Sequence, residues 1–333
     1  MSSQRFPKET RVPSDLRLPS DLKDPQEMQE LKNQEASWDL LRSTVPTSKD
    51  RQAQNQNKNP KQRPLSAAEA QTVKKETSAS NWDEGAIGRF MEDVRTTEFA
   101  YDLPCGATLI LFKQDTSAAS SIAEEVSGLL SWLGTPSGFT VYLWMRDDPR
   151  VLEADSWPSR RTVNGGFAYP GKPAIFVYRA EEYQRVILHE TIHALRWDWE
   201  MPEKPLPCWG FKKTDVISPH LFEAWTELYA EWLYCGYYNV SWTKQRKWQI
   251  YQATQILARV KDNWTENTNV FAYYVLKAAL APHISFLWIA GNGQTQEERA
   301  YVLCQLVEPE LRRLKEMAKT VEVERFSLRM TAL

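Results

Sequence analysis

The chain has 333 residues, a formal net charge of −2 and 42% hydrophobic residues. Because so balanced a charge provides no basic face, we expect neither nucleic acid nor a membrane as a partner. Four cysteines lie far apart without a C-x-x-C pair, and no apolar run follows the first residues, so the sequence predicts an intracellular, cytoplasmic protein without disulfides or a signal peptide.

Residues 1–80 are rich in Gln, Ser, Lys, Pro, Asp and Asn and contain only two aromatic residues, Phe6 and Trp38. Such a segment cannot bury enough apolar surface to offset the entropy lost on ordering. We therefore expect a disordered polar arm, in which residues 25–45 could form a short helix. Residues 82–325 contain most of the aromatic side chains and are predicted to form the folded domain.

The first half of this domain, residues 82–199, alternates between strand and helix patterns. Residues 82–94 predict a short helix with Ile87, Phe90, Met91 and Val94 on one stripe. The elements predicted after it are a strand over 107–112, a helix over 117–133 that ends at Gly134, a strand over 139–145, a surface loop over 147–161 and a hairpin formed by 165–169 and 174–178.

The second half of the domain, residues 218–320, has only helical patterns. The predicted helices span residues 221–235, 242–260, 270–290 and 296–319. The third contains Lys277, Pro282 and His283, so we interpret it as a buried helix and not as a membrane span. Together these patterns predict an α+β fold, with a small mixed-sheet lobe, a mostly helical second lobe and one helix between them.

That intermediate helix, over residues 184–197, contains His189-Glu190-Thr191-Ile192-His193, an H-E-x-x-H sequence. On a helix the two histidines, four positions apart, project from one face with Glu190 beside them. Two neutral imidazoles suit a zinc ion, and the adjacent carboxylate suits a general base that takes a proton from a zinc-activated water. A catalytic site of this kind needs a third protein ligand.

The sequence excludes one large class of zinc peptidases with this motif. Metzincins continue the motif as H-E-x-x-H-x-x-G-x-x-H, but Arg196 and Trp199 occupy the glycine and final histidine positions here. Further along, Ser218 and Pro219 predict the start of a helix that carries Glu223 and Glu227 one turn apart. Either glutamate could supply the third ligand.

Over residues 165–235 the chain resembles gluzincin-type, thermolysin-like zinc metallopeptidases. The resemblance implies a zincin-like fold, one Zn²⁺ ion held by His189, His193 and Glu223, and a carboxylate of Glu227 that orients a histidine ring. It also implies an edge strand that pairs with the peptide substrate, in the place of Gly165, Gly166, Phe167 and Ala168. The chain departs from the usual pattern at Ala224, where glycine is common, and at Glu227, where aspartate is frequent.

The same resemblance implies a donor that stabilises the oxyanion of the tetrahedral intermediate. The candidates are His220, Tyr229, Tyr273, Tyr274 and His283. The predicted function is therefore hydrolysis of a peptide or protein substrate with Glu190 as general base. Two alternatives remain: a zinc hydrolase of a non-peptide amide, and an interaction or scaffold protein whose structural zinc site is closed by Cys208 or His220.

Overall fold

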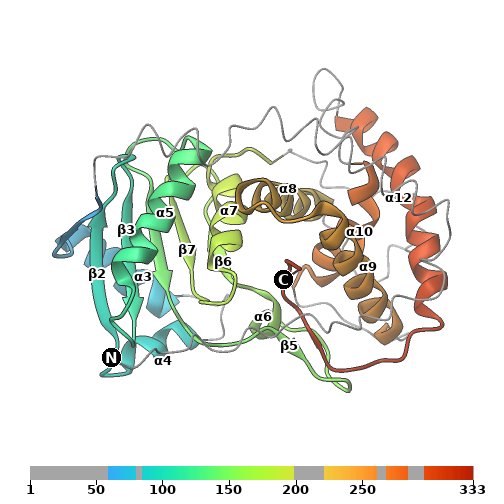
Figure 1. Ribbon diagram of the computed structural model, residues 1–333, viewed down its shortest axis with the longest axis horizontal. Helices are drawn as coiled ribbons and strands as arrows, with labels where there is room; N and C mark the ends of the chain where they lie inside the picture. The colour runs from blue at the N-terminus through green and yellow to red at the C-terminus, as the bar shows by residue number, and fades with distance from the viewer. Residues whose placement is uncertain (1–58, 80–84, 199–220, 261–267, 284–295, 333) are drawn as a thin grey trace.

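The chain forms two lobes in the computed structural model, which describes residues 59–79, 85–198, 221–260, 268–283 and 296–332. One lobe is built on a β-sheet and the other on helices, and helix α7 (Tyr183–Ala194) lies between them (Figure 1). The predicted α+β class with a mixed sheet is confirmed. The short helix predicted over residues 25–45 lies outside the described residues.

Within the described residues, the sheet has six strands in the order β1-β2-β3-β4-β7-β6. The three strands β3, β4 and β7 are parallel, whereas β1, β2 and β6 pair antiparallel with their neighbours. The strands are β1 (Lys61–Arg63), β2 (Thr97–Asp102), β3 (Thr108–Lys113), β4 (Thr140–Trp144), β6 (Gly166–Ala168) and β7 (Ala174–Val177). The predicted strands and hairpin are confirmed, and β2 is an additional strand.

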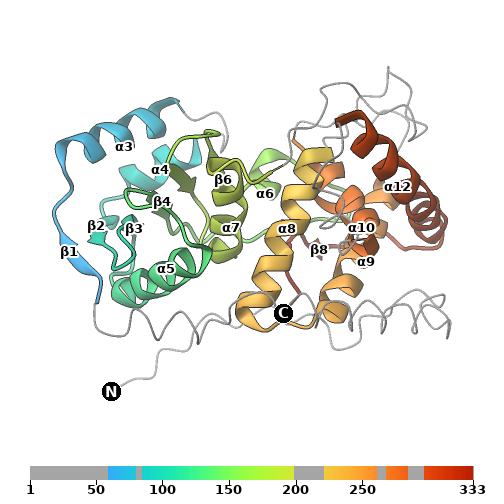
Figure 2. The same cartoon turned by 90° about the horizontal axis from the view of Figure 1, so that it is seen from above.

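The central strand β3 is buried on both faces, because successive side chains of a strand point to opposite sides of the sheet. Leu109 and Leu111 contribute to the core shared with helix α5 (Ala119–Leu133), and Ile110 and Phe112 contribute to a second cluster on the other face. Helices α3 (Ala67–Ala79) and α4 (Ala86–Glu92) cover that second face (Figure 2). The predicted helix over 117–133 is thus confirmed.

Helix α4 (Ala86–Glu92) is shorter than predicted at its C-terminal end. Its buried stripe contains Ile87 and Phe90, but Val94 is 99% exposed. The prediction that Val94 joins the stripe is wrong, because the backbone of Asp93 is extended and the helix ends before it.

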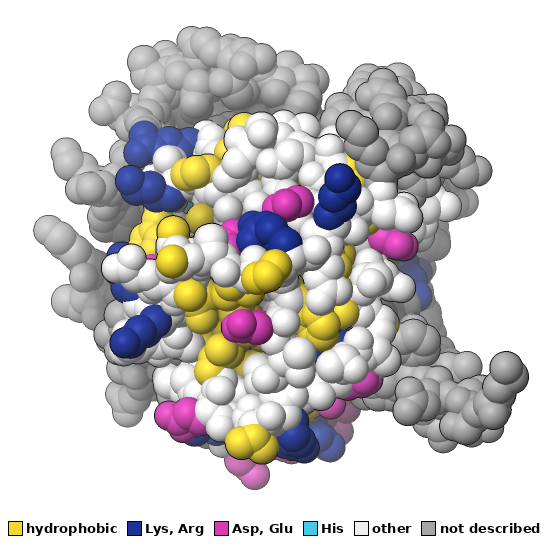
Figure 3. All heavy atoms as spheres, turned by 90° about the vertical axis from the view of Figure 1, so that its left-hand side faces the viewer, with side chains coloured by type: hydrophobic (Ala, Val, Ile, Leu, Met, Phe, Trp, Pro, Cys, Tyr) yellow, Lys and Arg dark blue, Asp and Glu magenta, His cyan; other side chains and the backbone are white. Residues whose placement is uncertain are grey.

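The prediction of a disordered arm up to residue 80 is wrong for residues 61–79, which form β1 and helix α3 (Ala67–Ala79). Strand β1 is held by backbone pairing with β2, which its polar side chains do not indicate. Polar contacts hold the helix: Arg63 donates to Glu69 at 2.6 Å, and the Tyr169 hydroxyl donates to Glu76 at 2.9 Å. On the face at this end of the molecule, charged side chains of both signs are interspersed with hydrophobic ones (Figure 3).

The second lobe contains α8 (Leu221–Tyr238), α9 (Trp242–Arg259) and α12 (Gln296–Ala318), as predicted. The helix predicted over 270–290 is confirmed for residues 271–283, which are helical throughout: a π-helix (Phe271–Leu276), helix α10 (Lys277–Leu280) and a 3₁₀ turn (Ala281–His283) follow one another. Residues 284–290 lie outside the described residues. None of the described helices combines the length and apolar character needed to cross a membrane.

The C-terminal segment, residues 326–332, returns from the helical lobe to the sheet lobe, although the predicted domain ended at residue 325. Strand β8 (Phe326–Ser327) pairs with β5 (Val151–Leu152), inside the predicted surface loop over 147–161. Gln245 and Trp248 of α9 donate to the carbonyl groups of Met330 at 2.6 Å and Arg329 at 2.8 Å. These residues therefore belong to the folded domain.

Candidate metal and catalytic site

Helix α7 presents both histidines of the H-E-x-x-H sequence from one face. The helix is buried along its length, since its apolar side chains pack into the core between the sheet and α8. His189 and His193 are only 6% and 9% exposed, and their Nε2 atoms lie 3.1 Å apart. Two nitrogen atoms that face each other so closely form one half of a possible metal site.

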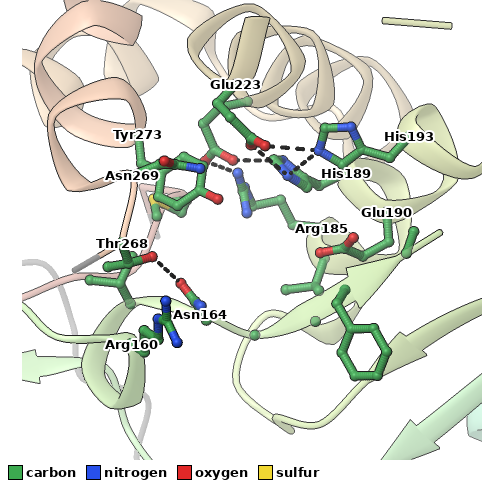
Figure 4. Close-up of a pocket in the computed structure, with 18 of the residues that line it drawn as sticks. Arg160, Asn164, Arg185, His189, Glu190, His193, Glu223, Thr268, Asn269 and Tyr273 are labelled. Atoms are coloured by element: carbon green, nitrogen blue, oxygen red, sulfur yellow. Dashed lines mark hydrogen bonds and ion pairs between the residues drawn. The ribbon is translucent and has the colours of Figure 1, made fainter. Parts of the chain in front are cut away.

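Helix α8 brings Glu223 to the two rings. Its Oε2 atom lies 3.7 Å from Nε2 of His189 and 3.5 Å from Nε2 of His193 (Figure 4). The three residues form a group that could hold a metal ion. Of the two glutamates that the sequence left open as third ligand, Glu223 is the one whose carboxylate faces both Nε2 atoms.

The donor atoms have the separations that a zinc ion requires. Bonds of about 2.1 Å at tetrahedral angles place two donors about 3.4 Å apart, and the separations here are 3.1, 3.5 and 3.7 Å. Oε2 of Glu223 is buried without a hydrogen-bond partner among the residues that the structure describes. A buried carboxylate oxygen is costly unless something compensates it, and a cation would do so.

Each histidine directs its other ring nitrogen to a carboxylate. Nδ1 of His189 lies 2.8 Å from Oε2 of Glu227, and Nδ1 of His193 lies 2.7 Å from Oδ2 of Asp198. At His193 the carboxylate of Asp198 can accept from Nδ1–H, which selects the tautomer in which Nε2 carries the free electron pair, whereas Glu227 lies at ion-pair distance from Nδ1 of His189. The predicted contact of Glu227 with a histidine ring is present, whereas sequence reasoning missed Asp198.

Asp198 reaches His193 because α7 ends in a left-handed turn. Arg196 has a φ of 54°, and N–H of Trp197 donates to the carbonyl of Ile192 at 2.9 Å. Glycine usually occupies this position of a helix end, since other residues are strained there. Because arginine does not favour the left-handed conformation, Arg196 gives no indication in the sequence of the turn that brings Asp198 to His193.

Glu227 is itself held by two buried cations. Arg185, on the preceding turn of α7, forms an ion pair with Oε1 of Glu227, and Nζ of Lys277 lies 3.7 Å from the same oxygen. Lys277 also pairs with Glu231, which accepts from the amide of Gln249. Opposite charges alternate through this interior, so the carboxylate beside His189 has a fixed position.

Glu190 lines the same pocket as the histidines and is 6% exposed. Burial raises its pKa to about 8. A divalent cation bound beside it would favour the carboxylate and lower this pKa. Its placement suits a group that exchanges a proton near neutral pH.

The two histidines differ in their affinity for a proton. Burial and the neighbouring His193 lower the pKa of His189. Burial also opposes a charge on His193, but Asp198 and Glu223 outweigh burial and raise the pKa of His193 to about 10. A metal ion that binds both Nε2 atoms must therefore displace a proton from the pair.

These residues line a pocket of about 450 Å³ between the lobes (Figure 4). One wall is strand β6, the last strand of the sheet, which pairs with β7 and with no other described strand. The other edge of β6 can therefore pair with an extended chain. All four predicted edge-strand residues line the pocket: Gly165, Gly166, Phe167 and Ala168.

Among the described candidates for the oxyanion donor, Tyr273 lines the pocket. Its ring meets that of His189 edge-on at 5.9 Å, and burial raises its pKa well above the usual value, so the hydroxyl keeps its proton. Tyr274 instead donates to the carbonyl of Leu328 at 2.8 Å. Tyr229 and His283 do not line the pocket, and His220 lies outside the described residues.

No protein-family model, curated protein or solved structure matches this chain. The arrangement at the site consists of three convergent donor atoms, two carboxylates behind the imidazole rings and a buried glutamate beside them, at the wall of a pocket with an edge strand.

Proposed function

We propose that this protein is a zinc-dependent metallopeptidase of gluzincin type with a zincin-like fold. The observation that carries the proposal is the convergence of Nε2 of His189, Nε2 of His193 and Oε2 of Glu223 within 3.7 Å of one another. These residues would hold one zinc ion. Two lobes joined by the motif helix, with an edge strand along the pocket, support the zincin-like assignment.

When bound, the ion would supply a Lewis acid that polarises the substrate carbonyl and makes water at the site more acidic. Glu190 takes a proton from the attacking water and transfers it to the leaving amine. Because water is the nucleophile, the protein forms no covalent bond to the substrate. The hydroxyl of Tyr273 donates a hydrogen bond to the oxyanion that develops on the carbonyl.

The substrate best suited to the pocket is an extended peptide. An extended backbone can pair with the open edge of β6, in the manner of an added strand. Gly166 is the first residue of β6, and a Cβ there would be 3.0 Å from Cγ of Glu190. A carbonyl group of a peptide that pairs with β6 would therefore lie close to the general base.

The experiment that tests this proposal measures zinc content and peptidase activity together. Purified wild type should contain about one zinc per chain, and Glu190→Gln should keep the zinc while its kcat falls by about 10²–10⁴. Glu124→Gln changes an exposed glutamate of α5 and serves as the matched control. Wild type that binds no zinc, or Glu190→Gln with full activity, would overturn the proposal.

A further inference from the structure

The pocket has a second polar wall that takes no part in the hydrolysis proposed above. Arg150, Arg160, Asn164 and Thr268 line it. Figure 4 shows Arg160, Asn164 and Thr268 on the opposite side of the pocket from the two histidines. These side chains come from three separate stretches of the chain, and together they form a polar surface on this side of the pocket.

Arg150 reaches this wall because residue 165 is glycine. A Cβ at Gly165 would lie 2.3 Å from Nη2 of Arg150 and 2.9 Å from Cγ2 of Val186. The arginine is 1% exposed and its Nη1 atom lies 3.3 Å from Oε2 of Glu182. Its Nε is itself buried, so Nη2, beside Gly165, is the part of this guanidinium next to the pocket wall.

Asn164 also presents a donor. The Thr268 hydroxyl donates to Oδ1 of Asn164 at 2.7 Å, so the amide NH₂ group is the part left for a ligand. The position of Asn164 is fixed, because its backbone carbonyl accepts from Arg179 at 3.2 Å and its N–H donates to the carbonyl of Arg160 at 2.9 Å. Arg160 adds a second guanidinium at the start of α6 (Arg160–Val163).

The charges of the pocket are separated between its two ends. Its lining contains three glutamates, and all of them belong to the histidine end: Glu190 beside the motif, Glu223 at the ring nitrogens and Glu227 behind His189. Glu227 is paired with Arg185 at that end. On the opposite wall, Arg150 and Arg160 lie among the described lining residues without an acidic one, although Glu182, which does not line the pocket, pairs with Arg150. That wall therefore favours an anion.

We infer that this wall is a subsite for a carboxylate of the substrate, so that the preferred substrates are acidic peptides. The inference rests on the proposed function. Guanidinium groups bind carboxylates through paired hydrogen bonds, and the amide of Asn164 adds a third donor. Both the side chain of an Asp or Glu and a free C-terminus provide this group.

The position of the acidic group follows from the strand that joins the two ends of the pocket. Gly165 adjoins Arg150, and the next residue, Gly166, adjoins Glu190. Neighbouring residues of a strand are about 3.3 Å apart. A peptide that pairs with β6 would therefore have its acidic group within one or two residues of the bond that is cleaved.

The inference is tested with alanine hexapeptides blocked at both ends that carry one Glu or one Gln at each position in turn. A further pair, all-alanine with a free or an amidated C-terminus, separates the two sources of the carboxylate. Wild type should cleave one acidic member with a kcat/KM at least about tenfold above its neutral partner. Equal values for every pair would overturn the inference.

The matched variants are Arg160→Met and Arg161→Met, which remove neighbouring arginines. Arg161 is exposed and does not line the pocket. Arg160→Met should lower the acidic-to-neutral ratio of kcat/KM about tenfold, whereas Arg161→Met should keep the ratio of the wild type. Equal ratios in the two variants would show that the preference arises elsewhere.

A binding measurement separates the inference from the proposed function. The same peptides are titrated into Glu190→Gln protein with and without Arg160→Met, and the dissociation constants are compared. Tighter binding of the acidic peptide that depends on Arg160, without hydrolysis by the wild type, would support the subsite and reject the peptidase. Hydrolysis of neutral and acidic peptides alike, with equal or undetectable binding of both, would reject the subsite alone.

Discussion

Nδ1 of His193 lies 2.7 Å from Oδ2 of Asp198, a residue only five positions further along the chain. The matching contact, between Nδ1 of His189 and Glu227, joins two different helices at 2.8 Å. One ring is thus oriented by a local turn and the other by packing between helices. Both contacts leave Nε2 facing the carboxylate of Glu223, so the site depends on both.

Asp198→Asn should weaken zinc binding by about 10–100-fold, because the amide keeps the size of the side chain but removes the charge that supports the ring of His193. Competition with a chromophoric chelator measures this affinity. Asp155→Asn, which changes an exposed aspartate, is the control and should bind zinc as the wild type does. Equal affinities of the two variants would mean that Asp198 does not support the ligand.

The third ligand is tested by comparing Glu223→Gln with Glu227→Gln. An amide is a poor ligand for zinc, so Glu223→Gln should be purified with little metal, whereas Glu227→Gln should retain it with reduced affinity. X-ray absorption of the zinc protein should give three protein ligands and one water. The reverse order of metal loss would assign the ligand to Glu227, and four protein ligands would indicate a structural site.

The parts of the fold that could be predicted from the sequence are those with a regular apolar spacing. The run at residues 107–112 predicts β3 because its apolar side chains fill both faces of the sheet, and the 3.6-residue period over 117–133 predicts α5. The pairing of His189 with His193 could be predicted from the helix alone, because residues four positions apart lie on the same face of a helix. Glu223 came from the resemblance, and its position near the rings depends on helix packing that no local pattern specifies.

The remaining parts depend on contacts between distant residues. The C-terminal segment alternates apolar and polar residues, and its buried apolar positions are Phe326, Leu328, Met330 and Ala332. This pattern does not specify a partner, however, because Gln245, which donates to the carbonyl of Met330, lies 85 positions away. Strand β1, with the sequence Lys-Gln-Arg, is stable only through its pairing with β2. Asp198 needed the left-handed backbone of Arg196, which sequence patterns assign to glycine.

Lys277→Met should destabilise the protein by about 3–5 kcal/mol, because it leaves the buried carboxylate of Glu231 without its cation. Both side chains are fully buried, and burial lowers the pKa of Lys277 to about 8. Urea denaturation gives the change in the free energy of unfolding.

The double variant Lys277→Met with Glu231→Gln removes both charges and should recover part of this loss. Lys319→Met, at an exposed pair with Glu316, should cost less than about 1 kcal/mol and serves as the control. A cost for Lys277→Met as small as that of the control would show that the ion pair is not a determinant of stability.

Stability should fall in acid because of Glu182, whose carboxylate accepts the N–H groups of Met330 at 2.9 Å and Thr331 at 2.8 Å. Burial opposes its charge, but Arg150, Arg329 and Arg185 outweigh burial, so the pKa lies below the ordinary 4.5. A carboxyl with a lowered pKa in the folded chain stabilises it above the unfolded pKa. This contribution is lost as the pH falls through the folded pKa.

The free energy of unfolding should therefore decrease below about pH 5, as measured by urea denaturation at a series of pH values. Glu182→Gln should be less stable than the wild type at pH 7 and should lose less stability between pH 7 and pH 4. Glu153→Gln, at an exposed pair with Arg325, should keep the pH dependence of the wild type. If both variants follow the wild-type curve, Glu182 does not hold the C-terminal segment.

Gly166→Ala should impair catalysis without removing the metal. An added Cβ would lie 2.8 Å from the backbone carbonyl of Phe176 and 3.0 Å from Cγ of Glu190, so β6 and α7 must separate. We expect a loss of about 1–3 kcal/mol in stability and a lower kcat/KM, with zinc content unchanged because the three ligands are untouched. Gly88→Ala, where the nearest atom is 3.8 Å away, is the matched control and should not destabilise the protein. Full activity of Gly166→Ala at wild-type stability would mean that the edge strand does not need its close approach to Glu190.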